Sequence, residues 1–117
     1  MANPDFRSLM QTIVQHWQET VMAYTAYMEN GKKFRYTEIL RTHNTAVKNL
    51  LAEHINIIPA DLVEDAKAII EHYTIWTAKW DQLKANLNPG PDDVFVFENE
   101  HRFPRAAAQR LEGSLES

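Results

Sequence analysis

The sequence predicts an all-α fold: an antiparallel, up-down-up bundle of three long helices, followed by a C-terminal extended arm and a short fourth helix. Apolar residues recur at spacings of three and four along three long segments, the pattern of a helix with one buried face. The 117 residues include only 3 glycines and 5 prolines, which stand where helices should begin or end. Only one segment has strand-like composition, and a single strand cannot form a sheet by itself.

The first helix should begin at Pro4 and end near Asn30, a length of about 27 residues or about 40 Å. Asn3 followed by Pro4 is typical of an N-cap and a first helical position. Gly31 supplies the left-handed residue that ends many helices. The predicted apolar face consists of Phe6, Met10, Ile13, Trp17, Val21, Tyr24 and Met28.

The second helix should run from about Tyr36 to His54, which is roughly 18 to 20 residues and about 30 Å. We expect its end at His54 because a histidine near the last carbonyl groups interacts favourably with the helix dipole. Its predicted apolar face consists of Tyr36, Ile39, Leu40, His43, Val47, Leu50 and Leu51.

The third helix has the most regular apolar spacing in the chain. Asp61 and Glu64 resemble a capping box that would open it, and Pro59 must lie before it. The segment 88–91, Asn-Pro-Gly-Pro, should end it because prolines remove backbone donors and restrict the residue before them. The predicted apolar face consists of Leu62, Ala66, Ile69, Tyr73, Trp76, Trp80, Leu83 and Leu87.

We divide the chain into a helical bundle domain, residues 1–91, and a C-terminal part, residues 92–117. Residues 94–97, Val-Phe-Val-Phe, should form an extended arm. Arg105 to Glu112 is a run of good helix formers closed by Gly113, so it predicts a short helix. The arm and this helix should pack on the bundle or on a partner.

Several classes of chemistry are excluded by composition. The absence of cysteine excludes disulfides, a thiolate nucleophile and cysteine-ligated metals. The glycines stand far apart, so no glycine-rich phosphate loop exists. Only His16 with Glu19, and Glu98 with His101, have a three-residue spacing that suits metal ligands on a helix. We therefore expect no catalytic residue, metal site or cofactor, and the sequence favours a binding protein over an enzyme.

The charge distribution allows one anion-binding alternative. The net charge of −4 argues against a general nucleic-acid binder. Five cations nevertheless gather over residues 32–48 against the single acid Glu38, and the choice lies between a solvated surface and a site for an anionic partner. The candidate anion patch consists of Lys32, Lys33, Arg35, Arg41 and Lys48.

The main functional prediction is a small protein–protein interaction or adaptor module. The first and third helices should be longer than the second by about two turns, so the second helix cannot cover the whole of their apolar faces. A second copy of the chain or the arm could cover the remainder, and we expect a homodimer, with another protein bound through the arm as a further possibility. The predicted interaction surface consists of Tyr24, Trp76, Trp80, Phe95, Phe97 and Phe103.

A second reading places a pocket inside the bundle. Buried tyrosine and tryptophan usually need a polar partner, so an aromatic cluster can line a site for a flat apolar ligand. The candidate pocket residues are His43, His72, Tyr73 and Trp76, with a histidine as acid or base if the pocket were catalytic. The chain starts without a basic and apolar secretory signal, so we expect a cytoplasmic protein, and no apolar run is long enough for a membrane span.

Overall fold

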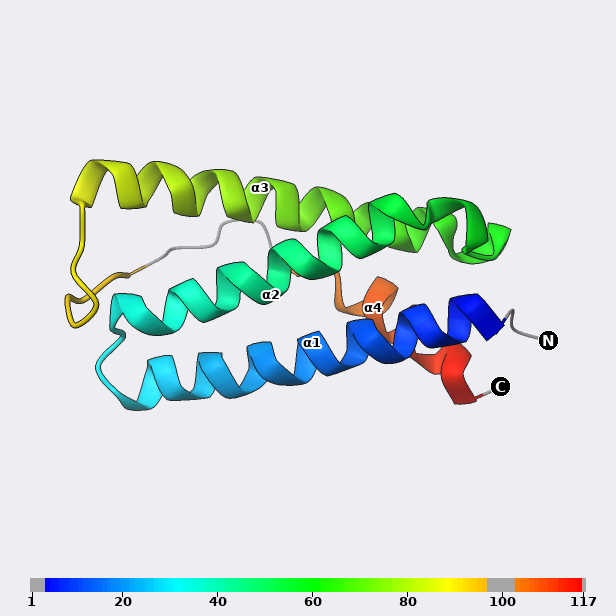
Figure 1. Ribbon diagram of the computed structural model, residues 1–117, viewed down its shortest axis with the longest axis horizontal. Helices are drawn as coiled ribbons and strands as arrows, with labels where there is room; N and C mark the ends of the chain where they lie inside the picture. Colours follow the sequence, from blue (N-terminus) through cyan, green and yellow to red (C-terminus); the bar gives the residue numbers. More distant parts are fainter. Residues whose placement is uncertain (1–3, 97–102, 117) are drawn as a thin grey trace.

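The computed structural model describes residues 4–96 and 103–116, and the fold is all-α as predicted. Three long helices, α1 (Pro4–Glu29), α2 (Phe34–Glu53) and α3 (Val63–Leu87), are followed by the short helix α4 (Arg105–Gly113). Short 3₁₀ helices occupy Ile55–Ile57, Ala60–Leu62 and Ser114–Glu116. The chain reverses direction between successive long helices, and the molecule is elongated, 48 × 23 × 20 Å (Figure 1). Among the described helices, none has both the length and the hydropathy required to span a bilayer.

The helix ends follow the predicted stop signals. Gly31 has a φ of +82°, the left-handed conformation that follows the end of α1. At the end of α3 the left-handed residue is Asn88, with a φ of +45°, because asparagine tolerates this conformation better than most residues. α2 ends at Glu53 with His54 as its C-cap, as expected.

The predicted capping box at the start of α3 is wrong. Asp61 lies in the 3₁₀ helix Ala60–Leu62, and α3 begins at Val63 with Leu62 as its N-cap and no side-chain cap. The backbone N–H of Leu62 donates to the carbonyl of Pro59 at 2.8 Å. A tight turn after the proline therefore starts the helix, and a side-chain cap is not used.

One end of the bundle is closed by four helices. Phe6, Met10 and Ile13 of α1 form a continuous core with residues of α2, α3 and α4. Arg110 of α4 binds Asp65 of α3 through two hydrogen bonds of 2.6 and 2.9 Å. The remaining fully buried large side chains of this core are Val47, Leu51, Ile69 and Leu111.

The start of the arm packs on its own bundle at the opposite end. Phe95 is fully buried and packs on Phe34 and Trp80, with ring centroids 5.0 and 6.2 Å away. Its N–H donates to the carbonyl of Lys32, and its carbonyl accepts from the Tyr27 hydroxyl at 2.6 Å. Residues 91–95 therefore dock within the same chain.

Residues 91–93, which lead into the arm, cap the N-terminus of α2. Lys33, the N-cap, makes no side-chain cap, so the first N–H groups of α2 need other acceptors. The N–H of Phe34 donates to the carbonyl of Asp93 at 2.9 Å, and that of Arg35 to the carbonyl of Pro91 at 3.0 Å. Within the described ranges the only β-type pairing near this contact is an isolated antiparallel bridge at Lys33, in keeping with the expectation that no sheet forms.

Candidate functional site

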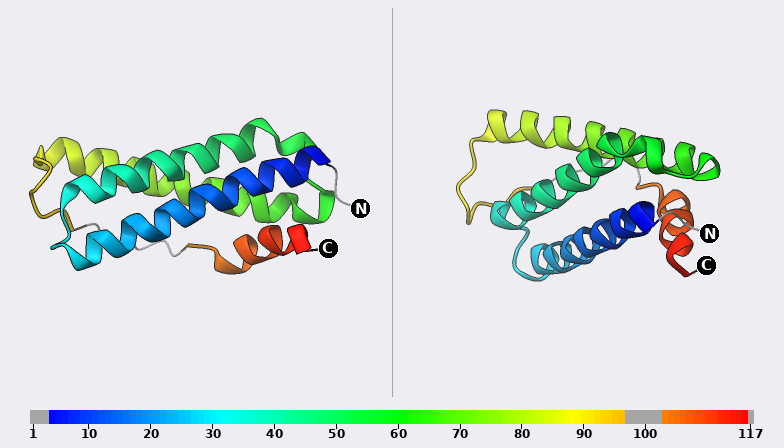
Figure 2. Two further views of the ribbon diagram at one scale, coloured as in Figure 1. Left: turned by 60° about the horizontal axis from the view of Figure 1, so that its bottom comes forward. Right: turned by 45° about the vertical axis from the view of Figure 1, so that its right-hand side comes forward.

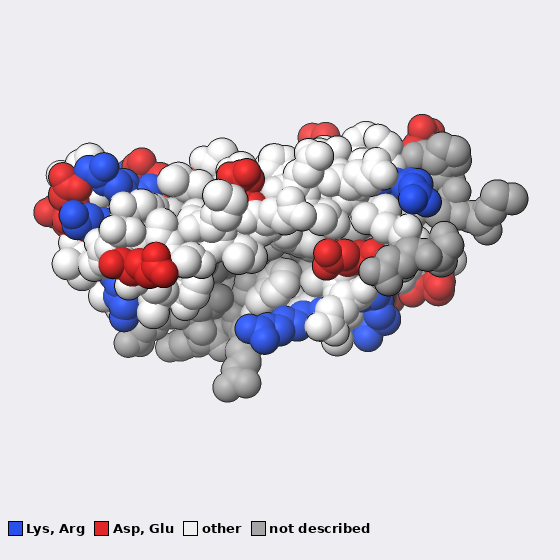
Figure 3. All heavy atoms as spheres, turned by 90° about the horizontal axis from the view of Figure 1, so that it is seen from below, with Lys and Arg blue, Asp and Glu red and all other residues white. Residues whose placement is uncertain are grey.

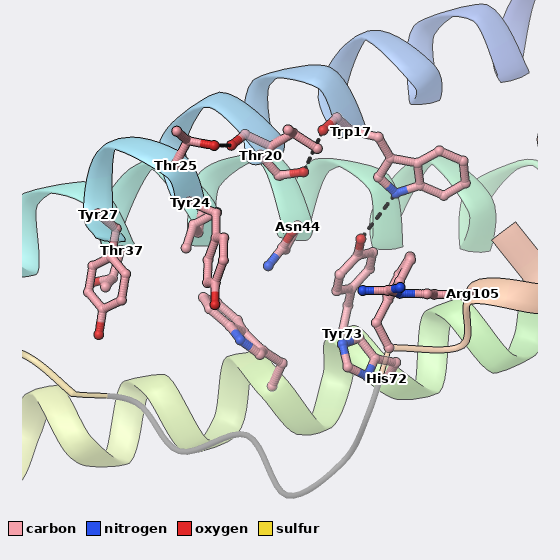
Figure 4. Close-up of a pocket in the computed structure, with 14 residues that line it drawn as sticks. Trp17, Thr20, Tyr24, Thr25, Tyr27, Thr37, Asn44, His72, Tyr73 and Arg105 are labelled. Carbon is pink, nitrogen blue, oxygen red and sulfur yellow. Dashed lines mark hydrogen bonds between the residues drawn. The ribbon is translucent and has the colours of Figure 1, made fainter. Parts of the chain in front are cut away.

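Among the described residues, one half of the bundle has no fourth helix, because α4 is much shorter than its neighbours; we call this the open half of the bundle. α4 has 9 residues and α1 has 26, and α4 lies beside the N-terminal half of α1 (Figure 2). Beside the C-terminal half of α1, no described helix takes the corresponding position. A cavity of about 1090 Å³ lies there. It is walled by α1, α2 and α3, with Phe103 and Arg105 at the side of α4 (Figure 4).

The walls of this cavity are largely aromatic. Trp17 of α1 donates its indole N–H to the hydroxyl of Tyr73 on α3 at 3.1 Å. Phe103 packs on both rings, with centroids 6.4 Å from Trp17 and 5.8 Å from Tyr73. Burial raises the pKa of Tyr73 to about 12, further above physiological pH than the ordinary value of about 10. No hydrogen bond within the described residues uses the Tyr73 hydroxyl proton, which is left as a donor toward the cavity.

Asn44 of α2 supplies a polar group with no partner. Its side chain is 7% exposed and points into the space between α1 and α3 (Figure 4). Within residues 4–96 and 103–116 its amide makes no hydrogen bond. Among the described residues, the fully buried side-chain polar atoms without a partner are the hydroxyls of Thr45 and Thr77. The amide of Asn44 is not one of them, so it can hydrogen-bond to water or to a ligand in the cavity.

Arg105 supplies the cation of the site. It is the first residue of α4, its side chain is exposed, and it points toward the cavity (Figure 4). It has no ion-pair partner in the described part of the chain. By contrast, Arg35, Arg41 and Arg110 each pair with an aspartate.

Three of the four predicted pocket residues line the cavity, namely His72, Tyr73 and Trp76. His43 does not, and that part of the prediction is wrong. Because successive residues on a helix are about 100° apart, Asn44 faces the cavity while His43 faces α1. There its Nδ1 lies 2.9 Å from the Nδ1 of His16. Burial, followed by the charge of His43, lowers the pKa of His16.

The predicted interaction surface is only partly exposed. Trp76, Trp80 and Phe95 are buried within the chain itself, at 8%, 3% and 0% exposure, so they cannot form an outer surface and this part of the prediction is corrected. The reason is that the docked arm and Phe34 cover the end of α3. Tyr24 is exposed and Phe103 is half-buried at the cavity. Phe97 lies outside the described residues.

The predicted anion patch is interrupted by carboxylates. Arg41 makes two hydrogen bonds to Asp81, of 2.8 and 3.0 Å, which raise the pKa of Arg41. Arg35 pairs with Asp92. These acids lie far from the patch in sequence, so charge counting along the chain could not reveal the pairing. Lys48 is half-buried, whereas Lys32 and Lys33 lie at the turn between α1 and α2.

Sequence reasoning missed Asn44 and Arg105. The signal for Asn44 was its place in the stripe Thr37, Leu40, Asn44, Val47 and Leu51, whose spacing is that of one helix face. Arg105 carried no comparable signal.

Over the described ranges, no three His, Asp or Glu side chains form a group that could bind a metal ion. Glu98 and His101 lie outside those ranges.

Comparison with protein families, with curated proteins and with solved structures found no match for this chain. Its function is therefore inferred from its own geometry.

Proposed function

We propose that this chain is a protein–protein interaction module that forms a homodimer, in which α1 of each copy covers the open half of the other. The observation that supports this proposal is the exposed surface of α1. Residues 20–28 contain no charged residue. Four large apolar side chains in this segment are about half or more exposed: Val21 65%, Met22 65%, Tyr24 54% and Met28 48%.

An uncharged apolar surface of this kind is typical of the buried core of an interface. On the face shown in Figure 3, charged side chains lie at both ends and also at several places in the middle, with broad uncharged areas between them. Val21, Tyr24 and Thr25 also line the cavity. The exposed stripe is therefore continuous with the open half of the bundle.

The spacing of the stripe suits a two-fold axis. Val21, Tyr24, Thr25 and Met28 follow a spacing of three, four and seven residues, which places them on one helix face. The stripe is symmetric about Tyr24 and Thr25. An antiparallel pair of α1 helices would place Val21 of one copy against Met28 of the other, as an isologous interface requires. Each α1 would then take the fourth-helix position beside the C-terminal half of the other.

The test is the mass of the full chain in solution, measured by sedimentation velocity over a wide range of concentrations. We expect the mass to rise with concentration toward that of two chains. Val21→Lys should keep the chain monomeric because it places a charge in the interface core. Val94→Lys is the matched control, since Val94 is 67% exposed but lies on the arm.

A wild-type chain that stays monomeric at every concentration overturns the proposal. So does a dimer that Val21→Lys leaves intact, because the contact would then lie elsewhere. A dimer that is lost equally in both variants also contradicts the role of α1.

A further inference from the structure

We infer that the inner part of the cavity binds a small organic anion with a flat aromatic body, such as an aromatic carboxylate. This inference concerns the same cavity as the proposed dimer but depends on other side chains: the polar groups come from α2, α3 and α4, whereas the dimer depends on Val21, Tyr24 and Thr25 of α1. Three features point to it: the aromatic walls, the unpartnered amide of Asn44 and the unpaired guanidinium of Arg105.

The aromatic walls indicate that the ligand has a flat, apolar body. Trp17, Tyr73 and Phe103 enclose one side of the cavity, and Trp76 extends the wall along α3. Flat apolar molecules gain most from such rings because they stack on them or meet their edges. The volume of about 1090 Å³ is large enough for a drug-sized molecule and a few waters.

Asn44 gives the site a specific hydrogen-bonding group. The residue is 7% exposed, and its amide points into the cavity and makes no hydrogen bond within the described chain. Small-molecule sites usually combine apolar walls with a few such polar groups that fix the orientation of the ligand. The Tyr73 hydroxyl offers a second donor nearby.

Arg105 determines the charge of the ligand. The described residues that line the cavity include no aspartate or glutamate, and Arg105 is their one arginine or lysine. A guanidinium binds a carboxylate through two parallel hydrogen bonds, which adds both strength and geometry. An anion therefore suits this cavity better than a cation or a neutral molecule.

The first experiment compares two fluorescent probes that share an aromatic body and differ in charge: 1-anilinonaphthalene-8-sulfonate and the neutral N-phenyl-1-naphthylamine. The sulfonate should bind the full chain saturably, one molecule per chain. Arg105→Gln should weaken it about tenfold or more, because a charge-assisted hydrogen bond is lost, and should leave the neutral probe unchanged. Arg7→Gln, at another exposed arginine that lies outside the cavity, is the control and should change neither.

The inference is overturned if the sulfonate does not saturate, or if Arg105→Gln affects both probes equally or neither. The sedimentation of Arg105→Gln should match that of the wild-type chain. A failure of the anion site and a failure of the dimer are therefore separate results.

A second variant, Asn44→Leu, distinguishes a binding role from a structural one. If Asn44 serves a ligand, leucine should raise the thermal midpoint of the free chain and lower the affinity for the sulfonate probe. A lowered midpoint would show that the amide stabilises the fold, and it would remove Asn44 from the site.

Discussion

Replacing Phe95 by alanine should destabilise the chain strongly, because the structure docks the arm on its own bundle. The ring is fully buried against Phe34 and Trp80. Truncation of a buried phenylalanine costs about 3–5 kcal/mol. We expect the lower end, about 3 kcal/mol, because the backbone hydrogen bonds of residue 95 remain and half-buried Leu40 and Leu83 can move into the space.

The assay is urea unfolding followed by far-UV circular dichroism, at one fixed chain concentration because dimerisation would add concentration-dependent stability. Val94→Ala is the control: its side chain is exposed, so we expect a change within about 0.5 kcal/mol. If Phe95→Ala changed the free energy of unfolding no more than Val94→Ala, the arm would not be docked as described and the reasoning would be refuted.

Two further predictions concern pH. Burial and His43 lower the pKa of His16 in the folded chain, so the unfolded chain binds this proton more readily, and stability should fall as pH drops below about 6.5. His16→Gln should flatten this decline and the exposed His54→Gln should keep it; a decline that is unchanged in His16→Gln contradicts the assignment. Arg110 lowers the pKa of Asp65, so this pair should stabilise the fold above about pH 4 and lose its effect at lower pH. Urea unfolding of Asp65→Asn should show lower stability at neutral pH and a weaker acid dependence than the wild-type chain, whereas the exposed Asp61→Asn should resemble the wild-type chain; equal behaviour of the two variants would exclude the contribution of the pair.

The helices could be predicted from local signals, because each signal acts within a few residues. Gly31 ends α1, and the Asn-Pro-Gly-Pro segment after Leu87 ends α3, since proline and left-handed residues restrict the backbone directly. The first residue of α3 was harder to predict from the sequence. A 3₁₀ turn after Pro59 replaced the side-chain cap that Asp61 was expected to provide.

The buried face of α2 was predicted only in part: Val47 and Leu51 are fully buried as predicted, but hydrophobicity alone does not decide which polar residues are buried. Thr37 is buried, since its hydroxyl donates to the carbonyl of Phe34 and accepts from the indole of Trp80. Ile39, by contrast, is 42% exposed. Trp80 comes from a distant helix, so the sequence pattern did not reveal this contact, and His43 was placed in the pocket instead of Asn44.

The candidate site was only partly predictable for the same reason. The aromatic residues Tyr73 and Trp76 stood out in the helical spacing of α3. The position of Arg105 depends on how α4 packs across α3 and α1, which is a long-range property of the fold. The pairing of Arg41 with Asp81, which interrupts the predicted basic patch, is likewise a contact between distant segments.

The most direct test of the proposed dimer uses the absence of cysteine from the chain. Thr25→Cys places a single thiol next to the expected two-fold axis, where two copies of one residue come close enough for a disulfide. Under mild oxidation it should form a covalent dimer rapidly, whereas Val94→Cys, on the arm, should stay monomeric. Equal and slow cross-linking of the two variants would contradict a contact between α1 helices.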